Sequence, residues 1–206
     1  SNSKNLHRVI YWYKLFKYSF LYRCRINWYV DCCFYCEKII LRKKLINLKL
    51  TNNIKLINKK FNKNEFYHYL ETSNLSIVIP KIKNKYILVY QKRVPINQIN
   101  FEFPSGIIEK NETALLSAKK ELIEETGYKS IDKLKKITSF YSEPGRLTTK
   151  ITGFFCNNLI KISKPEKGIK IHIVSDHQII KLIKNRKFNN ASHIGMFLFY
   201  KKKYAR

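Results

Sequence analysis

The sequence predicts an α/β (α+β) domain in which helices pack on a mixed β-sheet. Three observations support this class: short runs rich in β-branched and aromatic residues recur along the chain, a helical pattern interrupts them, and two further helical segments close the chain. With 206 residues, 45% of them hydrophobic, the chain can bury one core and has little room for a second. We therefore expect one domain over residues 46–206, preceded by a separate N-terminal segment over residues 1–45.

The first expected strands form a hairpin. Leu75–Pro80 and Tyr86–Gln91 are β-rich runs, and the turn-prone residues Lys83–Lys85 separate them. Asn100–Phe103 has the pattern of another short strand, which Pro104 ends because proline cannot donate a ladder hydrogen bond. Three later runs have the same character: Ile137–Tyr141, Ile151–Cys156 and Ile169–Val174. These runs supply the sheet.

A central helix follows the third of these strands. Its apolar stripe consists of Ala114, Leu115, Ala118 and Leu122. Asn111 is the expected N-cap, and Gly127 is the expected stop at the C-terminal end. Two more helices are expected around His177–Lys184 and Ser192–Tyr200. They supply the helical layers of the domain.

The formal net charge of +27 would suit a nucleic acid partner, because lysine and arginine release counterions from phosphates. However, Lys, Ile and Asn are abundant together, as in Asn52–Lys55, which is typical of an AT-rich coding sequence. We favour this compositional interpretation, and a nucleic acid partner stays open as the less favoured alternative.

Residues 1–45 hold four of the five cysteines: Cys24, Cys32, Cys33 and Cys36. The single CxxC has no second ligand pair at zinc-site spacing, so no zinc site is expected. The odd number of cysteines and the lack of a signal peptide favour a cytoplasmic location. Charged residues interrupt the aromatic stretch from Tyr11 to Tyr35, so no membrane span is expected. Three interpretations of residues 1–45 remain open: a native appendage, an extension without native function, and part of an organelle transit peptide.

Three carboxylates lie on one side of the central helix. Glu121, Glu124 and Glu125 stand at i, i+3 and i+4, where like charges repel. Carboxylate oxygens are the ligands that Mg²⁺ prefers, often together with substrate phosphates. A solvated acidic face is the alternative. The cluster stands out in a chain with only 14 acidic residues, which weakens the solvated-face interpretation, and both interpretations stay open at this point.

The segment from Gly106 to Tyr128 reads GIIEKNETALLSAKKELIEETGY. It resembles the Nudix box, GX5EX7REUXEEXGU, at every fixed position except Lys120, where the family has arginine. The resemblance implies the Nudix fold, a mixed sheet between helices, with bound Mg²⁺ or alternatively Mn²⁺. It also implies that Glu121 and Glu125 are the principal metal ligands and that Glu124 is a further ligand or the catalytic base.

The resemblance assigns three supporting roles. Glu112 is a supporting carboxylate, and the backbone carbonyl of Ser105 joins the metal ligands. Lys120 replaces the arginine that orients the catalytic carboxylates. Lysine keeps the charge but loses the bidentate fork of arginine.

The flanks of the box resemble those of ADP-ribose pyrophosphatases. Gln91–Pro95 is similar to their QYRxP segment, and Phe101–Gly106 is similar to ELPAG. We expect Arg93 and Glu102 to hold the substrate, and a surface salt bridge is the alternative for Arg93.

A proline downstream of the box supports the same branch. Pro144 lies 16 residues beyond Tyr128, and Glu143–Gly145 resembles the SPG loop of these enzymes. We therefore expect Pro144 and Gly145 to contribute to substrate binding. Where relatives often have a glutamate base after the proline, this chain has Thr148, Thr149 and Lys150. Glu124 or Glu166 could take that role.

The expected reaction is hydrolysis of the pyrophosphate bond of ADP-ribose or a similar nucleoside diphosphate sugar, which gives AMP and a sugar phosphate. Two alternatives remain: a Nudix hydrolase for another nucleotide or an RNA cap, and a catalytically weakened module that only binds nucleotides. Lys120 and the missing loop glutamate suggest the second alternative. The resemblance also implies a homodimer.

Overall fold

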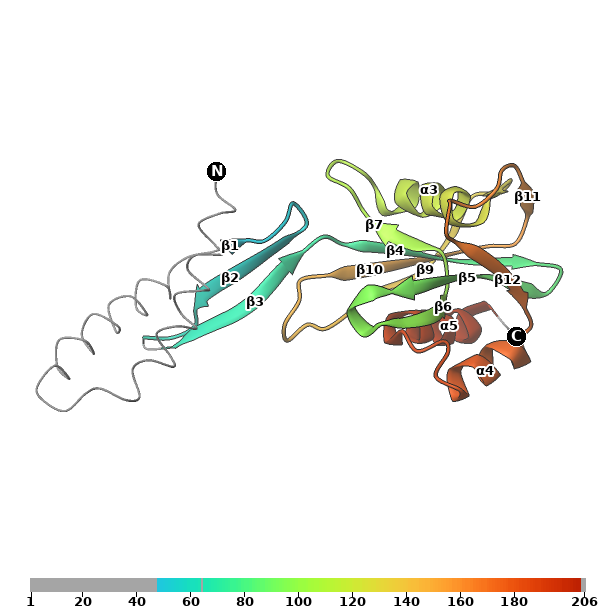
Figure 1. Ribbon diagram of the computed structural model, residues 1–206. Coiled ribbons are helices and arrows are strands. Elements are labelled where there is room, and N and C mark those ends of the chain that lie inside the picture. Colours follow the sequence, from blue (N-terminus) through green and yellow to red (C-terminus); the bar gives the residue numbers. More distant parts are fainter. Residues whose placement is uncertain (1–47, 64, 205–206) are drawn as a thin grey trace, which may run out of the picture. The chain divides into compact units, whose positions relative to one another are not determined.

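A seven-stranded sheet forms the centre of the fold (Figure 1). Its strands are β4 (Leu75–Ile82), β5 (Lys85–Arg93), β6 (Gln98–Glu102), β7 (Ser105–Ile107), β9 (Lys135–Tyr141), β10 (Lys150–Cys156) and β12 (Lys170–Val174). The order is β12-β5-β4-β10-β9, with β6 beside β5 and β7 beside β4. Since β4 pairs with β10 in parallel and with β5 and β7 antiparallel, the sheet is mixed, as the sequence predicts.

The computed structural model describes residues 48–63 and 65–204. All of them belong to one compact unit, Asn47–Arg206. The expected N-terminal segment over residues 1–45, with its cysteine cluster, lies outside the described residues. Within the described part of the chain, no helix is both long enough and apolar enough to span a bilayer.

Helices cover both faces of the sheet (Figure 1). They are α3 (Ala114–Thr126), α4 (Asp176–Lys184) and α5 (Ala191–Tyr204). Side chains alternate along β4, so Val78 packs in the cluster under α3, whereas Ile77 and Ile79 pack in the larger cluster under α4 and α5. This alternation builds the expected arrangement of a mixed sheet between helices.

The predicted β4–β5 hairpin is present, with a two-residue turn. Lys83 and Asn84 have φ angles of 44° and 62°, and Ile82 pairs with Lys85. Positive φ at both central positions is typical of the type I′ turn, whose twist matches that of the flanking strands. Lys85 therefore belongs to β5 and not to the turn.

The N-cap predicted for the central helix was wrong. Thr113 caps α3, and its side chain accepts a hydrogen bond from the backbone N–H of Leu116. Asn111 lies two residues earlier with φ 71°, a left-handed conformation that asparagine adopts more readily than most residues. At the other end, Gly127 is the C-cap with φ 74°, as predicted.

The sequence did not reveal a three-stranded sheet made of β1 (Leu48–Lys49), β2 (Ile54–Lys60) and β3 (Phe66–Thr72). Lysine and asparagine are interspersed in β2, so its apolar residues do not alternate cleanly. Four shorter elements were also missed: the 3₁₀ turn η1 (Val94–Ile96), the strand β7, and the paired strands β8 (Tyr128–Ser130) and β11 (Leu159–Lys161).

Gly153 of β10 permits close packing of α5 on the sheet. A Cβ placed at this glycine would lie 2.0 Å from Sδ of the buried Met196. We expect Gly153→Ala to lower the free energy of unfolding by about 1–3 kcal/mol, because the methionine must leave its packed position. The matched control is Gly195→Ala, whose Cβ would meet only an ordinary contact, 3.7 Å from Phe140. Urea unfolding measures both, and equal effects would contradict this packing.

Candidate functional site

Glu125 lies on the sheet-facing side of α3 and is 7% exposed. One carboxylate oxygen accepts a hydrogen bond from the backbone N–H of Ser105 at 2.8 Å, and the other lies 3.4 Å from Nε2 of Gln91. Burial, assisted by the negative charge of Glu121, raises the pKa of Glu125 to about 7 even though these hydrogen bonds oppose the shift. The carboxylate thus occupies a poorly solvated place at the start of β7.

Glu121 lies against the backbone of Gly106. A Cβ on Gly106 would stand 2.0 Å from Oε1 of Glu121, so only glycine leaves room for this carboxylate. Burial raises the pKa of Glu121, and the charges of Glu124, Glu166 and Glu112 raise it further. Several negative charges therefore surround one half-buried carboxylate.

The loop after β11 contributes to this cluster. The backbone N–H of Glu166 donates to the carbonyl of Glu124 at 2.8 Å, which holds the loop beside α3. On the other side, the carboxylate of Glu112 accepts a hydrogen bond from the backbone N–H of Glu109 at 3.2 Å. Lys120 is exposed, and its positive charge lowers the pKa of Glu121. Lysine at this position therefore retains an electrostatic effect on the cluster.

The donor set fits a hard divalent cation. Glu121 and Glu125 offer carboxylate oxygens beside the backbone of Ser105, and Mg²⁺ and Mn²⁺ prefer oxygen ligands. Over residues 48–63 and 65–204, no three acidic, histidine or cysteine side chains are gathered as ligands around one point. Carboxylates repel one another when no cation lies between them. Burial raises the pKa of both Glu121 and Glu125, and neighbouring carboxylates raise it further, so a bound divalent cation would stabilise their ionised forms.

Arg93 and Glu102 form an ion pair with each other. Nε of Arg93 donates to Oε1 of Glu102 at 2.9 Å, and a terminal nitrogen donates to Oε2. The Glu102 side chain is 1% exposed and that of Arg93 is 39% exposed, so the ion pair has a buried partner and is not a simple surface bridge. The charge of Arg93 also lowers the pKa of Glu125, which places the guanidinium near the carboxylate cluster. A role of Arg93 and Glu102 in binding substrate stays a prediction.

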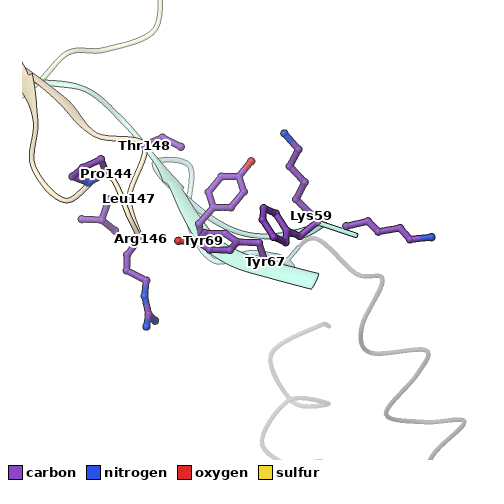
Figure 2. Close-up of a pocket in the computed structure, with 9 residues that line it drawn as sticks. Lys59, Tyr67, Tyr69, Pro144, Arg146, Leu147 and Thr148 are labelled. Atoms are coloured by element: carbon purple, nitrogen blue, oxygen red, sulfur yellow. The ribbon is translucent and has the colours of Figure 1, made fainter. Parts of the chain in front are cut away.

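Pro144 lines a cavity of about 500 Å³. Its lining comprises Lys59, Lys60, Phe61, Tyr67, Tyr69, Pro144, Arg146, Leu147 and Thr148. Figure 2 shows the tyrosines of β3 beside the loop that carries the proline. The hydroxyl of Tyr67 donates to the carbonyl of the neighbouring Gly145. No glutamate of α3 lines this cavity, and a substrate role for Pro144 and Gly145 stays a prediction.

Two residues near the carboxylates, Gln91 and His193, were not predicted to contact them. Gln91 belongs to the segment that flanks the box, but the sequence gives no sign of its contact with Glu125. His193 of α5 is 4% exposed and has Nε2 3.7 Å from Oε2 of Glu102. His193 is far from Glu102 along the chain, so no local sequence pattern predicts their contact. The contact becomes visible only from the packing of α5.

His193 should make the stability of the domain depend on pH. Burial lowers the pKa of His193 to about 4, against the opposing effect of Glu102 and with a smaller contribution from Arg93. An imidazole in the unfolded chain titrates near pH 6.5, so between these values the unfolded state binds more protons and stability falls as pH falls. We expect His193 to account for a loss of about 2 kcal/mol between pH 7 and pH 5.

Urea unfolding of the wild type and of His193→Asn at both pH values measures this loss. Asparagine offers an acceptor oxygen in place of Nδ1 and does not titrate. The wild type should lose more stability on acidification than the variant. Parallel losses in the two proteins would show that His193 is not the titrating group.

Comparisons with known proteins identify the domain that carries these residues. Residues 72–171 match the NUDIX domain model. The chain is 27% identical over 164 residues to the ADP-ribose pyrophosphatase of Bacillus subtilis (strain 168), which covers 75% of this chain and 87% of that protein. It is 28% identical over 106 residues to the methanol dehydrogenase activator of Bacillus methanolicus, covering 52% of this chain and 55% of that protein.

A solved structure supports the fold. The crystal structure of an ADP compounds hydrolase matches with a TM-score of 0.65 at 16% identity, and the match covers 76% of this chain and 89% of that chain. The box and the carboxylates of Glu121 and Glu125 lie within residues 72–171, which match the NUDIX domain model. The chain therefore belongs to the Nudix hydrolases, through a Nudix domain over residues 72–171, and is related to ADP-ribose pyrophosphatases.

Proposed function

We propose that this chain hydrolyses the pyrophosphate bond of ADP-ribose, or of a closely similar nucleoside diphosphate sugar, to AMP and a sugar phosphate in a Mg²⁺-dependent reaction. One observation carries the proposal: Glu121 and Glu125 lie buried or half-buried against Gly106 and Ser105, within a Nudix domain. The similarity to an ADP-ribose pyrophosphatase over 87% of its length supports the choice of substrate.

Glu121 and Glu125, with the carbonyl of Ser105, would hold the metal ion. Glu124, a half-buried residue of α3, can serve as a further ligand. When bound, Mg²⁺ neutralises phosphate oxygens and lowers the pKa of the attacking water. Mn²⁺ accepts the same oxygen ligands, so it should support the reaction as well.

A base must take the proton of the attacking water. In the loop after Pro144, where relatives often have a glutamate base, this chain has Thr148 and Thr149. Both are hydrogen-bonded to Thr72, which holds the loop against β3. Glu124 and Glu166 remain as candidates, because both charges act on Glu121. The base should be the one whose glutamine variant keeps substrate affinity but loses turnover near neutral pH.

Arg93 would stabilise the diphosphate. Its guanidinium has two donors committed to Glu102 and is partly exposed beside the cluster. An arginine fixed in this way can offer its remaining donors to phosphate oxygens without a further loss of side-chain entropy. Glu102 then serves as the buried anchor of the arginine.

We also propose a homodimer in the cytoplasm. Several apolar residues of the β1–β3 region are exposed: Leu48, Leu50, Leu56, Phe61 and Tyr67. An exposed apolar sheet is typical of an interface between chains. Sedimentation velocity measures the assembly, and a monomer at micromolar concentration would contradict it.

The function is tested by incubating the protein with Mg²⁺ and a panel of ADP-ribose, other nucleoside diphosphate sugars, nucleoside triphosphates and capped RNA, then identifying the products. The proposal predicts AMP and ribose 5-phosphate from ADP-ribose as the fastest reaction. Faster cleavage of capped RNA or a triphosphate would favour the other Nudix activities. Binding of ADP-ribose without AMP release would indicate a module that only binds nucleotides.

A further inference from the structure

The ring of His193 has a defined orientation and tautomer. Its Nδ1 accepts a hydrogen bond from the backbone N–H of Phe103 at 3.1 Å. The ring also stacks on Phe103 at an interplanar angle of 4° and packs edge-on against Phe188. Because Nδ1 accepts, the proton of the neutral imidazole is on Nε2.

The protonated nitrogen faces a buried carboxylate. Nε2 of His193 lies 3.7 Å from Oε2 of Glu102, and both side chains are 5% exposed or less. This separation exceeds a hydrogen bond, so the contact is that of an N–H dipole with a nearby negative charge. The same Oε2 accepts a hydrogen bond from Arg93. His193 therefore touches the oxygen that determines how the guanidinium is held.

The ion pair in turn faces the metal site. Two nitrogens of Arg93 are bonded to Glu102, so the position of the carboxylate sets the plane of the guanidinium. The charge of Arg93 acts on Glu125, whose other neighbours are Ser105 and Gln91. Contacts thus connect His193 of α5 to Glu102 and Arg93, and the charge of Arg93 acts on the carboxylate of Glu125 on α3.

We infer that His193 is a positioning residue, which fixes Glu102 and through it the guanidinium of Arg93 in the orientation that binds the diphosphate. The inference rests on the proposed function. His193 touches neither substrate nor metal in this arrangement. Its effect is expected on substrate affinity, because Arg93 contacts the diphosphate in the ground state as well as in the transition state.

Two substitutions separate positioning from packing. In His193→Asn, the side-chain oxygen replaces Nδ1 and can accept from Phe103, but nothing replaces Nε2. In His193→Gln, the amide replaces Nε2 and can donate toward Glu102, but the acceptor for Phe103 is lost. We expect His193→Asn to raise KM for ADP-ribose about ten-fold with kcat within about three-fold, and His193→Gln to keep KM within about three-fold while unfolding at a lower temperature.

A purely structural role predicts the opposite order. KM would then follow the melting temperature, and His193→Gln would be the more impaired enzyme. That result, or an unchanged KM in both variants, would overturn the inference.

A second readout does not depend on activity. The Nε–H group of Arg93 can be followed by ¹⁵N NMR and assigned by its loss in Arg93→Lys. We expect its exchange with water to accelerate about ten-fold in His193→Asn and to stay near the wild-type rate in His193→Gln. Absence of ADP-ribose turnover in the wild type would defeat the proposed function alone, whereas equal exchange in wild type and His193→Asn would defeat the positioning role alone.

Discussion

Replacing Glu125 by glutamine should lower turnover of ADP-ribose about 10³-fold and leave the fold intact. Glutamine keeps an oxygen that can accept the hydrogen bond of Ser105 N–H, but it loses the charge that a divalent cation requires. The free energy of unfolding of Glu125→Gln should be equal to or higher than that of the wild type. Burial raises the pKa of Glu125 to about 7, so an ionised carboxylate at this place weakens the metal-free fold at neutral pH.

The matched control is Glu109→Gln, the same substitution on an exposed loop residue before α3. It should retain turnover within about two-fold, because surface substitutions away from a site have small effects. Steady-state kinetics and thermal unfolding of both variants provide the comparison. If Glu125→Gln kept the wild-type turnover, the carboxylate of Glu125 would not be part of the catalytic site.

Adding a single methyl group at Gly106 should lower turnover about 100-fold. In Gly106→Ala, the new Cβ would lie 2.0 Å from Oε1 and 2.2 Å from Cδ of Glu121. The carboxylate must then move by about 1 Å or more, and displacements of that size in a catalytic group cost about two orders of magnitude in rate. The side chain is only half-buried and can swing toward solvent, so the unfolding free energy should change little.

Gly195→Ala of α5 is the control for this prediction, since its Cβ meets no atom closer than 3.7 Å. It should retain full turnover and gain a little helix stability. A crystal structure or the affinity for Mn²⁺ would locate the effect of Gly106→Ala. Full activity in this variant would mean that the position of Glu121 beside the glycine does not matter for the reaction.

The sequence predicted the elements whose pattern is local. β4 and β10 are nearly continuous apolar runs, and the stripe of α3 repeats at helical spacing. β2 and β3 were missed because lysine, asparagine and histidine interrupt their apolar residues, and because their pairing with each other is not visible in a local pattern. Local pattern thus identified most strands of the seven-stranded sheet and overlooked β2 and β3.

The sequence also predicted only part of the candidate site. Glu121, Glu124 and Glu125 were found because their spacing on one helix and the surrounding box are visible in the chain. The contact of Glu121 with Gly106 depends on how α3 packs over β7. The contact of His193 with Glu102 joins residues 91 positions apart and depends on α5 packing beneath the sheet. Neither contact leaves a periodic signal in the sequence.

The central claim is that carboxylates of α3 hold a divalent cation against a diphosphate, and Mn²⁺ binding tests it most directly. Electron paramagnetic resonance counts free Mn²⁺ during titration of the wild type and of Glu121→Gln/Glu125→Gln, each with and without ADP-ribose. The account predicts saturable binding to the wild type that ADP-ribose tightens, and its loss in the double variant. Equal Mn²⁺ binding by the two proteins would contradict it.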